Sequence, residues 1–141
     1  MRYILLIFIT ILLPSCSLGE RSSSFIRRHK YEEVENITIS YLDVFNVEEE
    51  RYYLYYFQTT CGHCLEIKDR MIEFALSEKE KIFFVEIKKD EGFLSESPID
   101  TLYTSDPLKA FSKVTPQLSL VEEGMITNTV IGKEEILLII E

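Results

Sequence analysis

The sequence is poor in the residues that bind nucleic acids or metal ions. It has 15 lysines and arginines against 24 aspartates and glutamates, a net charge of −9, and so offers no electrostatic basis for binding a phosphate backbone. It has only two histidines and three cysteines, whereas a structural zinc site usually takes four ligands. We therefore expect no nucleic acid partner, no cofactor and no metal. A zinc site built from His29, Cys61, His63 and Cys64 stays open as a minor alternative.

The sequence also lacks an apolar run long enough to cross a bilayer. The apolar stretch near its start, Ile4–Leu13, holds ten residues and as a helix would span about 15 Å, half of the ~30 Å hydrocarbon layer. With Arg2 ahead of it, this stretch has the layout of a secretory signal. Residues 1–15 are therefore predicted to be removed, and the protein is predicted to lie outside the cytoplasm, where disulfides can persist.

The end of this signal, LPSC at Leu13–Cys16, resembles the lipobox of bacterial lipoproteins. The resemblance implies that Cys16 becomes the lipidated first residue and anchors the chain at the extracytoplasmic face of the bacterial cell membrane. Residues 16–30 are mostly polar and small, which predicts a flexible tether with a reach of about 20 Å. An ordinary signal peptide with an unmodified cysteine and an uncleaved anchor remain as alternatives.

Residues 31–141 are predicted to form one domain, because 46% hydrophobic and 12% aromatic content is enough to fill a single core. Within it, Arg51–Gln58 alternates apolar side chains on both faces, with Tyr52, Leu54 and Tyr56 on one and Tyr53, Tyr55 and Phe57 on the other. Such a strand belongs in the middle of a sheet that is covered on both sides.

A helix and a second strand are predicted to follow. Over Gly62–Ser77 the pattern is helical, with its apolar side formed by Leu65, Met71, Ile72, Ala75 and Leu76. Lys81–Lys88 is rich in branched and aromatic side chains and is predicted to be a buried strand. Strand, helix and strand in this order form a parallel unit.

The other predicted elements are shorter. Before the central strand we expect a strand at Ile37–Ser40 and a helix at Tyr41–Val47. Between residues 89 and 113 only two short helical pieces are expected. A hairpin is predicted from the glycine-containing loop between two apolar runs, and an apolar stripe predicts a closing helix. The helical pieces, the hairpin strands and the closing helix fall at Ile99–Tyr103, Asp106–Phe111, Gln117–Val121, Met125–Val130 and Lys133–Glu141.

This order of elements, together with two motifs, resembles the thioredoxin family. The motifs are CGHC at Cys61–Cys64, where the central strand gives way to its helix, and VTP at Val114–Pro116, before the hairpin. The resemblance covers about residues 31–141. It implies an α/β thioredoxin fold with a central mixed sheet and helices on both faces, and a cis Thr115–Pro116 peptide bond packed beside the dithiol.

The resemblance also implies activity as a thiol-disulfide oxidoreductase. CGHC occurs in protein disulfide isomerases, whereas Thr60 and Tyr55 stand where many thioredoxins have a tryptophan and a buried acid. These two residues fit the exported branches of the family better, including the bacteriocin-transport-accessory-like proteins of Gram-positive bacteria.

The position of the cysteines assigns them different roles. Cys61 lies at the exposed N-terminus of the helix, where unpaired N–H groups and the helix dipole stabilise a thiolate, so we expect it to be the attacking nucleophile. Cys64, one turn further in, would resolve the mixed disulfide, and Gly62 would leave the turn open to a substrate sulfur. A protonated His63 would favour the reduced dithiol and make the disulfide form a better oxidant.

We therefore predict a membrane-anchored, extracytoplasmic thiol-disulfide oxidoreductase. Its partners would be exported proteins carrying thiols or disulfides and a redox partner that recharges the dithiol; the direction of electron flow stays open. Two alternatives remain besides zinc. A structural disulfide across four residues would stabilise the fold by only about 2 kcal/mol. A binding module would hold extended polypeptide at Thr115 and Pro116 with little or no redox turnover.

Overall fold

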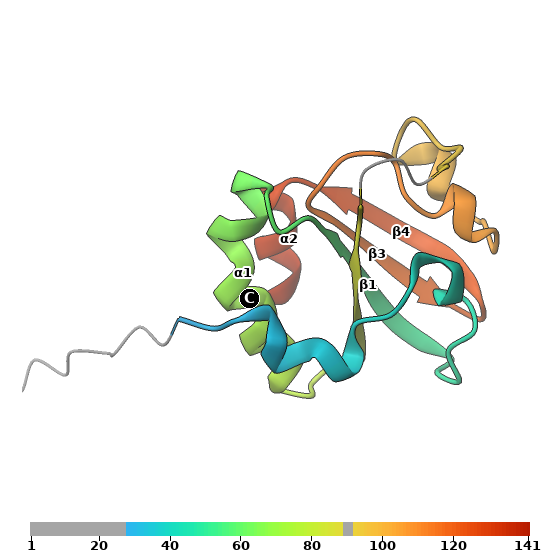
Figure 1. Ribbon diagram of the computed structural model, residues 1–141. Coiled ribbons are helices and arrows are strands. Elements are labelled where there is room, and N and C mark those ends of the chain that lie inside the picture. Colours follow the sequence, from blue (N-terminus) through green and yellow to red (C-terminus); the bar gives the residue numbers. More distant parts are fainter. Residues whose placement is uncertain (1–27, 89–91) are drawn as a thin grey trace, which may run out of the picture.

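The computed structural model describes residues 28–88 and 92–141, and in this part the chain forms a four-stranded mixed sheet (Figure 1). β1 pairs in parallel with β2 and antiparallel with β3, and β3 pairs antiparallel with β4. β1 therefore lies inside the sheet, as its apolar pattern predicts. The strands run β2-β1-β3-β4 across the sheet, with bounds β1 Arg51–Phe57, β2 Ile82–Glu86, β3 Gln117–Glu122 and β4 Met125–Ile131.

The alternation of side chains along β1 divides the core into two clusters, one on each face of the sheet. Tyr55 and Phe57 pack with the helices on one face. Tyr52, Leu54 and Tyr56 pack on the opposite face. Because successive side chains of a strand point to opposite sides, the predicted partition of this strand is confirmed, and each face buries its own layer.

Two α-helices, α1 (Gly62–Leu76) and α2 (Lys133–Ile140), cover the first face (Figure 1). α1 follows the prediction within one residue, but its buried side differs from it. Leu65 and Leu76, expected to face the core, are 49% and 51% exposed. Cys64 and Ile67 are buried instead, because the inward-facing Cys64 sets the helix register and turns Leu65, about 100° further round, toward solvent.

Short 3-10 turns and their connecting segments cover the second face. Helices were predicted on both faces, but among the described residues this face is covered by 3-10 turns in place of α-helices. Phe93 and Phe111, which flank the turns, meet edge-on with ring centroids 4.9 Å apart, and Phe111 stacks on Tyr56 of β1. The turns are η2 (Tyr41–Asp43), η3 (Ile99–Thr101) and η4 (Pro107–Lys109).

The segment before β1 departs from the prediction in two places. A 3-10 helix, η1 (Tyr31–Ile37), precedes the place of the predicted strand. At residues 38–40 the strand is reduced to an isolated bridge from Thr38 to Phe84 of β2, beside which the Ile39 N–H donates to the Phe84 carbonyl at 2.8 Å. Full burial of Val34 fixes this helix against the first core cluster. The helix expected at residues 41–47 is reduced to η2, after which the backbone N–H and the side chain of Asn46 bond to Asp43 in a turn.

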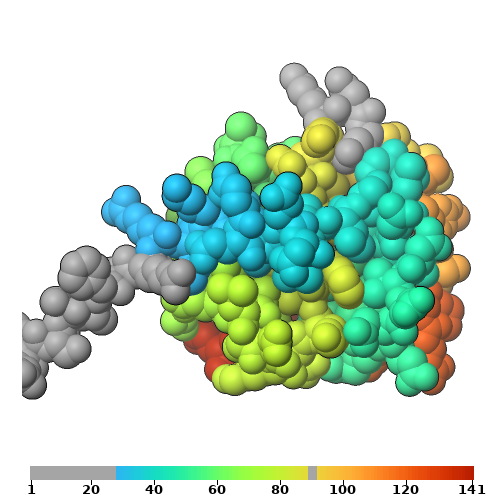
Figure 2. All heavy atoms as spheres, turned by 60° about the horizontal axis from the view of Figure 1, so that its bottom comes forward, coloured from blue at the N-terminus to red at the C-terminus, as the bar shows by residue number. Residues whose placement is uncertain are grey.

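The N-terminal end of the described chain is docked on α1, and Figure 2 shows this segment lying over the helix. His29 falls within the predicted tether, yet it is only 5% exposed. Its backbone N–H donates to Asp69 of α1 at 3.0 Å, and its ring Nδ1 lies 3.0 Å from a carboxylate oxygen of Glu33. The predicted signal peptide, Cys16 and residues 16–27 of the tether lie outside the described residues.

The predicted hairpin and closing helix are both present. Glu123 and Gly124 join β3 to β4 with φ of 51° and 76°, as a two-residue type I′ turn requires. In α2, Ile136 is fully buried, whereas Leu138 is 80% exposed. Within residues 28–88 and 92–141, no helix is long and apolar enough to cross a membrane.

Candidate active site at the start of helix α1

The two cysteines of the CGHC motif lie where β1 passes into α1. β1 ends at Phe57, a turn closes with the Cys61 N–H donating to the Gln58 carbonyl at 3.1 Å, and α1 begins at Gly62. Cys61 is the extended residue that caps the helix. Both cysteines are free thiols, Cys61 partly exposed and Cys64 fully buried. The sequence therefore presents one sulfur to solvent and keeps the other beneath it.

The Cys61 sulfur is tied to both elements that flank it. It accepts a hydrogen bond from the Cys64 backbone N–H at 3.3 Å, and so takes the place of a side-chain cap on α1. Its S–H lies 3.6 Å from the Thr115 carbonyl, to which it donates. The predicted nucleophile therefore sits between the helix N-terminus and the loop that precedes β3.

The surroundings of Cys61 lower its pKa from the ordinary value of a cysteine. Partial burial acts in the opposite direction, because it disfavours the thiolate. Hydrogen bonds from the Cys64 thiol, the Thr115 side chain and the backbone amides of Cys64 and His63 together outweigh this effect. Each of these donors stabilises a negative sulfur, so Cys61 is the thiol that ionises first.

The surroundings of Cys64 act the other way and raise its pKa to about 12. Burial is the largest cause, and the hydrogen bond that its thiol gives to Cys61 adds to it. The Gln58 backbone and the Thr115 side chain lower the value in part. The two sulfurs therefore differ in the direction of their pKa shifts, lowered for Cys61 and raised for Cys64.

The Thr115–Pro116 peptide bond lies next to Cys61 and is cis, as the resemblance implies. Pro116 is buried, and its carbonyl accepts a hydrogen bond from the Gly132 N–H at 3.0 Å. Gly132 is the residue before α2, with a φ of 93° that favours glycine. This bond ties the loop before β3 to the start of α2, and so positions the Thr115 carbonyl and side chain at the dithiol.

A buried polar network behind Pro116 was not predicted from the sequence. The Gln117 side chain, fully buried, accepts from the backbone N–H and hydroxyl of Ser112 at 2.9 and 2.7 Å. It donates to the Ala110 carbonyl and to Ser119, both at 2.9 Å. These bonds hold the loop of residues 110–117 in place. The signal in the sequence is the alternation of Gln117 and Ser119 with the apolar residues Leu118 and Leu120 at the start of the strand.

The two residues between the cysteines are exposed. No atom lies within 4 Å of the position that a Cβ would take at Gly62, so the turn next to Cys61 has free space on this side. The His63 side chain is 66% exposed, and its Nδ1 lies 3.7 Å from a carboxylate oxygen of Glu66. Glu66 also forms an ion pair with Lys133 at the start of α2, which lowers the pKa of the Glu66 carboxyl.

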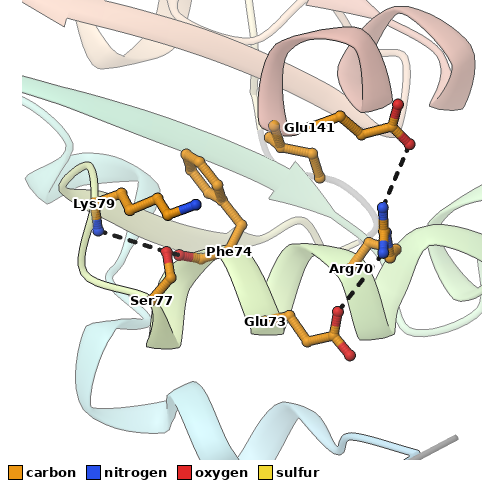
Figure 3. Close-up of a pocket in the computed structure, with 7 residues that line it drawn as sticks. Arg70, Glu73, Phe74, Ser77, Lys79 and Glu141 are labelled. Atoms are coloured by element: carbon orange, nitrogen blue, oxygen red, sulfur yellow. Dashed lines mark hydrogen bonds and ion pairs between the residues drawn. The ribbon is translucent and has the colours of Figure 1, made fainter. Parts of the chain in front are cut away.

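A hollow in the surface lies apart from the dithiol. It has a volume of about 470 Å³ and lies between the second half of α1 and the end of α2 (Figure 3). Arg70 reaches across it to Glu141 at 3.4 Å and to Glu73 at 4.0 Å. These charges are paired with one another, and the hollow contains no thiol. Among the described residues no group of three or more histidine, cysteine or acidic side chains is arranged to hold a metal ion.

Comparison with known proteins identifies the fold. No protein-family model matches the sequence, and no curated protein sequence matches it. Among solved structures, thioredoxin f2 from Chlamydomonas reinhardtii matches with a TM-score of 0.54 and 14% identity over 73% of this chain and 89% of that one. Mitochondrial thioredoxin 3 from Saccharomyces cerevisiae matches with a TM-score of 0.49 and 15% identity over 75% and 92%. The likeness to thioredoxin f2, together with the order of strands and helices, shows that the chain has the α/β thioredoxin fold.

Proposed function

We propose that this protein is a thiol-disulfide oxidoreductase that exchanges disulfides with exported proteins through Cys61 and Cys64. One observation carries the proposal: the partly exposed Cys61 sulfur caps α1 and accepts from the Cys64 N–H, with the free thiol of Cys64 buried one turn further in. The direction of the pKa shifts, lowered for Cys61 and raised for Cys64, agrees with this geometry. A thiolate is the attacking species in disulfide exchange. The pair thus offers a ready nucleophile and a reserve thiol on a thioredoxin fold.

In the reducing direction, the reaction takes two steps. The Cys61 thiolate attacks one sulfur of a substrate disulfide, forming a mixed disulfide and releasing the other substrate sulfur as a thiolate, which takes a proton from solvent. The Cys64 sulfur then attacks Cys61, forming the Cys61–Cys64 disulfide. The second substrate sulfur leaves with the proton that Cys64 gives up. The substrate gains two electrons and the dithiol loses two; the oxidising direction is the reverse.

The surroundings of the dithiol bear on the direction. A protonated His63 stabilises the reduced pair and makes the disulfide a better oxidant. Glu66, 3.7 Å from His63, opposes this effect, and Lys133 partly neutralises Glu66. A redox partner that recharges the dithiol completes the cycle in either direction.

In this proposal the domain works outside the cytoplasm, on a lipid anchor at Cys16. The support is the LPSC sequence at residues 13–16 and the apolar segment before it. Cys16→Ala should move the protein from the membrane fraction to the soluble extracytoplasmic fraction without changing the exchange activity of the domain. Retention of this variant in the membrane would contradict the lipid anchor and favour an uncleaved apolar anchor.

The activity itself is tested with purified protein in both directions. The reduced chain is mixed with insulin, whose interchain disulfides are followed by precipitation, and the oxidised chain with a reduced, unfolded protein whose thiols are counted. We expect exchange in at least one direction, and none from Cys61→Ser. If the wild-type chain exchanged disulfides in neither direction, the proposed oxidoreductase activity would be contradicted, and the binding module would be the favoured function.

A further inference from the structure

Two tyrosine hydroxyls without a hydrogen bond are buried in and against the core cluster that contains Cys64. Tyr55 of β1 and Tyr31 of η1 each bury their hydroxyl oxygen, and neither has a hydrogen-bond partner among the described residues. Buried polar atoms of this kind are rare in folded proteins and call for an explanation, which can be a catalytic or redox role. On the same strand, the buried hydroxyl of Tyr52 does have a partner, because it donates to the Val44 carbonyl at 2.6 Å.

The rings of Tyr31 and Tyr55 both contact the ring of Phe57. Tyr31 stacks on Phe57 with ring centroids 4.2 Å apart, and Tyr55 lies parallel to it at 5.8 Å. Tyr55, Phe57 and Cys64 belong to one buried cluster, against which Tyr31 and Cys61 pack. The two phenols are therefore fixed by ring contacts in the layer that holds the buried sulfur.

The charges around these hydroxyls indicate whether they act as hydrogen-bond donors or as bases. Burial raises the pKa of both Tyr31 and Tyr55 far above the ordinary tyrosine value, and negative charge on Cys64 raises each further. The two hydroxyls also affect each other, although their geometry makes no hydrogen bond between them. Even if one hydroxyl turned to donate to the other, the second O–H would stay free to donate. Both stay protonated when the thiols ionise, so they serve as donors and never as bases.

We propose that Tyr31 and Tyr55 are positioning residues that stabilise the Cys64 sulfur while it attacks the mixed disulfide. This inference rests on the proposed function. In the reduced protein Cys64 is a neutral thiol and a weak acceptor, so the donors are held in reserve. In the resolving step negative charge develops on Cys64 inside the apolar layer, where a preorganised donor is worth more than in water.

The step is the second one described above, with the same balance of bonds. The Cys64–Cys61 bond forms, the bond between Cys61 and the substrate sulfur breaks, and the Cys64 proton passes to the departing sulfur. The phenols keep their own protons throughout. Their effect is confined to the resolving step, and the first attack by Cys61 should depend on them little.

The test separates the two steps with dithiobis(nitrobenzoic acid), a small disulfide that releases a coloured thiolate each time it is cleaved. Attack by Cys61 releases the first coloured thiolate, and resolution by Cys64 releases the second. The full chain is purified in detergent, and a Cys61→Ser, Cys64→Ser double variant gives the contribution of Cys16. We expect Tyr55→Phe to keep the first phase and to slow the second about tenfold, the equivalent of one unit in the pKa of Cys64.

Tyr56→Phe is the matched control. Tyr56 is the next residue on β1, it is equally buried, and its hydroxyl also lacks a partner among the described residues, but it lies in the cluster on the opposite face. Losing this hydroxyl should leave both phases unchanged.

The pH dependence gives a second readout for Tyr55→Phe. The midpoint of the pH dependence of its second phase should be higher than that of wild type, which a purely structural role would not cause.

Each result has a definite meaning. If wild type shows no first phase, the proposed function itself fails. If wild type shows both phases and Tyr55→Phe resolves at the wild-type rate and pH, the positioning role is overturned. Equal slowing by Tyr55→Phe and Tyr56→Phe would overturn it as well, since the effect would then come from packing of the strand. Tyr31→Phe should slow the second phase in the same way as Tyr55→Phe.

Discussion

The backbone N–H of Cys64 donates to the sulfur of Cys61 at 3.3 Å, so the first thiol caps the helix that carries the second. The cap has two consequences at once. It places the Cys61 sulfur where the helix dipole and free amides stabilise negative charge, and it buries Cys64 one turn further along. The different ionisation of the two sulfurs thus follows from where α1 begins.

The first prediction concerns the pH dependence of alkylation. The rate at which iodoacetamide modifies Cys61 should rise with a midpoint below the ~8.5 of an ordinary cysteine, because hydrogen bonds lower its pKa. Cys64→Ala should move this midpoint upward, since the donating thiol is lost. Mass spectrometry of the labelled peptides measures both. Modification of Cys64 as fast as that of Cys61 would contradict the assignment of roles.

The second prediction concerns His63 and Glu66, whose charges oppose each other near Cys61. His63→Ala should make the dithiol more reducing and Glu66→Gln more oxidising when measured at mildly acidic pH against a glutathione pair. Both side chains are exposed, so each change should stay below tenfold in the equilibrium constant, about 30 mV. Shifts of the same sign in the two variants would show that charge on this turn does not set the potential.

The third prediction concerns the network around Gln117. Gln117→Ala should lower the free energy of unfolding by about 3 kcal/mol, because buried partners at Ser112 and Ala110 lose their hydrogen bonds. Ser112→Ala, which removes only one of these bonds, should cost about 1 kcal/mol. Urea unfolding measures both. A Gln117→Ala variant as stable as wild type would show that the network does not hold the loop.

The fourth prediction concerns stability at alkaline pH. Burial raises the pKa of Tyr56 in the folded protein well above the ~10 of an exposed tyrosine. Below about pH 10 this hydroxyl is protonated in both the folded and the unfolded chain and adds no pH dependence. Above about pH 10 only the unfolded chain loses this proton, so the free energy of unfolding falls as the pH rises. Tyr56→Phe should therefore make the decline shallower by about 1.4 kcal/mol per pH unit. Urea midpoints between about pH 9 and 11 give the slope; parallel curves for variant and wild type would contradict burial of the hydroxyl.

Much of the fold could be predicted because its central strand carries strong signals. Alternating apolar side chains in Arg51–Gln58 fixed both faces of β1, and the position of CGHC fixed the start of α1. The strand predicted at Ile37–Ser40 is present only as an isolated bridge from Thr38 to Phe84, because the 3-10 helix before it extends as far as Ile37 and leaves few residues to pair. Short segments of this kind are decided by tertiary packing that local patterns do not contain.

The site was predictable to the same degree. Cys61, Cys64 and Pro116 fall where the motifs place them, because each is fixed by an element boundary. Gln117 and Tyr31 escaped notice, since their roles depend on burial and on partners far away in the sequence. Cys16 and the signal peptide stay predictions, because they lie outside the described residues.

The most direct test of the central claim, exchange through Cys61, is capture of the mixed disulfide. Cys64→Ser removes the resolving thiol, so the chain expressed at its natural location should accumulate covalent complexes with exported proteins, visible on non-reducing gels and identified by mass spectrometry. These complexes should vanish on reduction and be absent from the Cys61→Ser, Cys64→Ser variant. An empty trap, or complexes that persist without Cys61, would contradict the account.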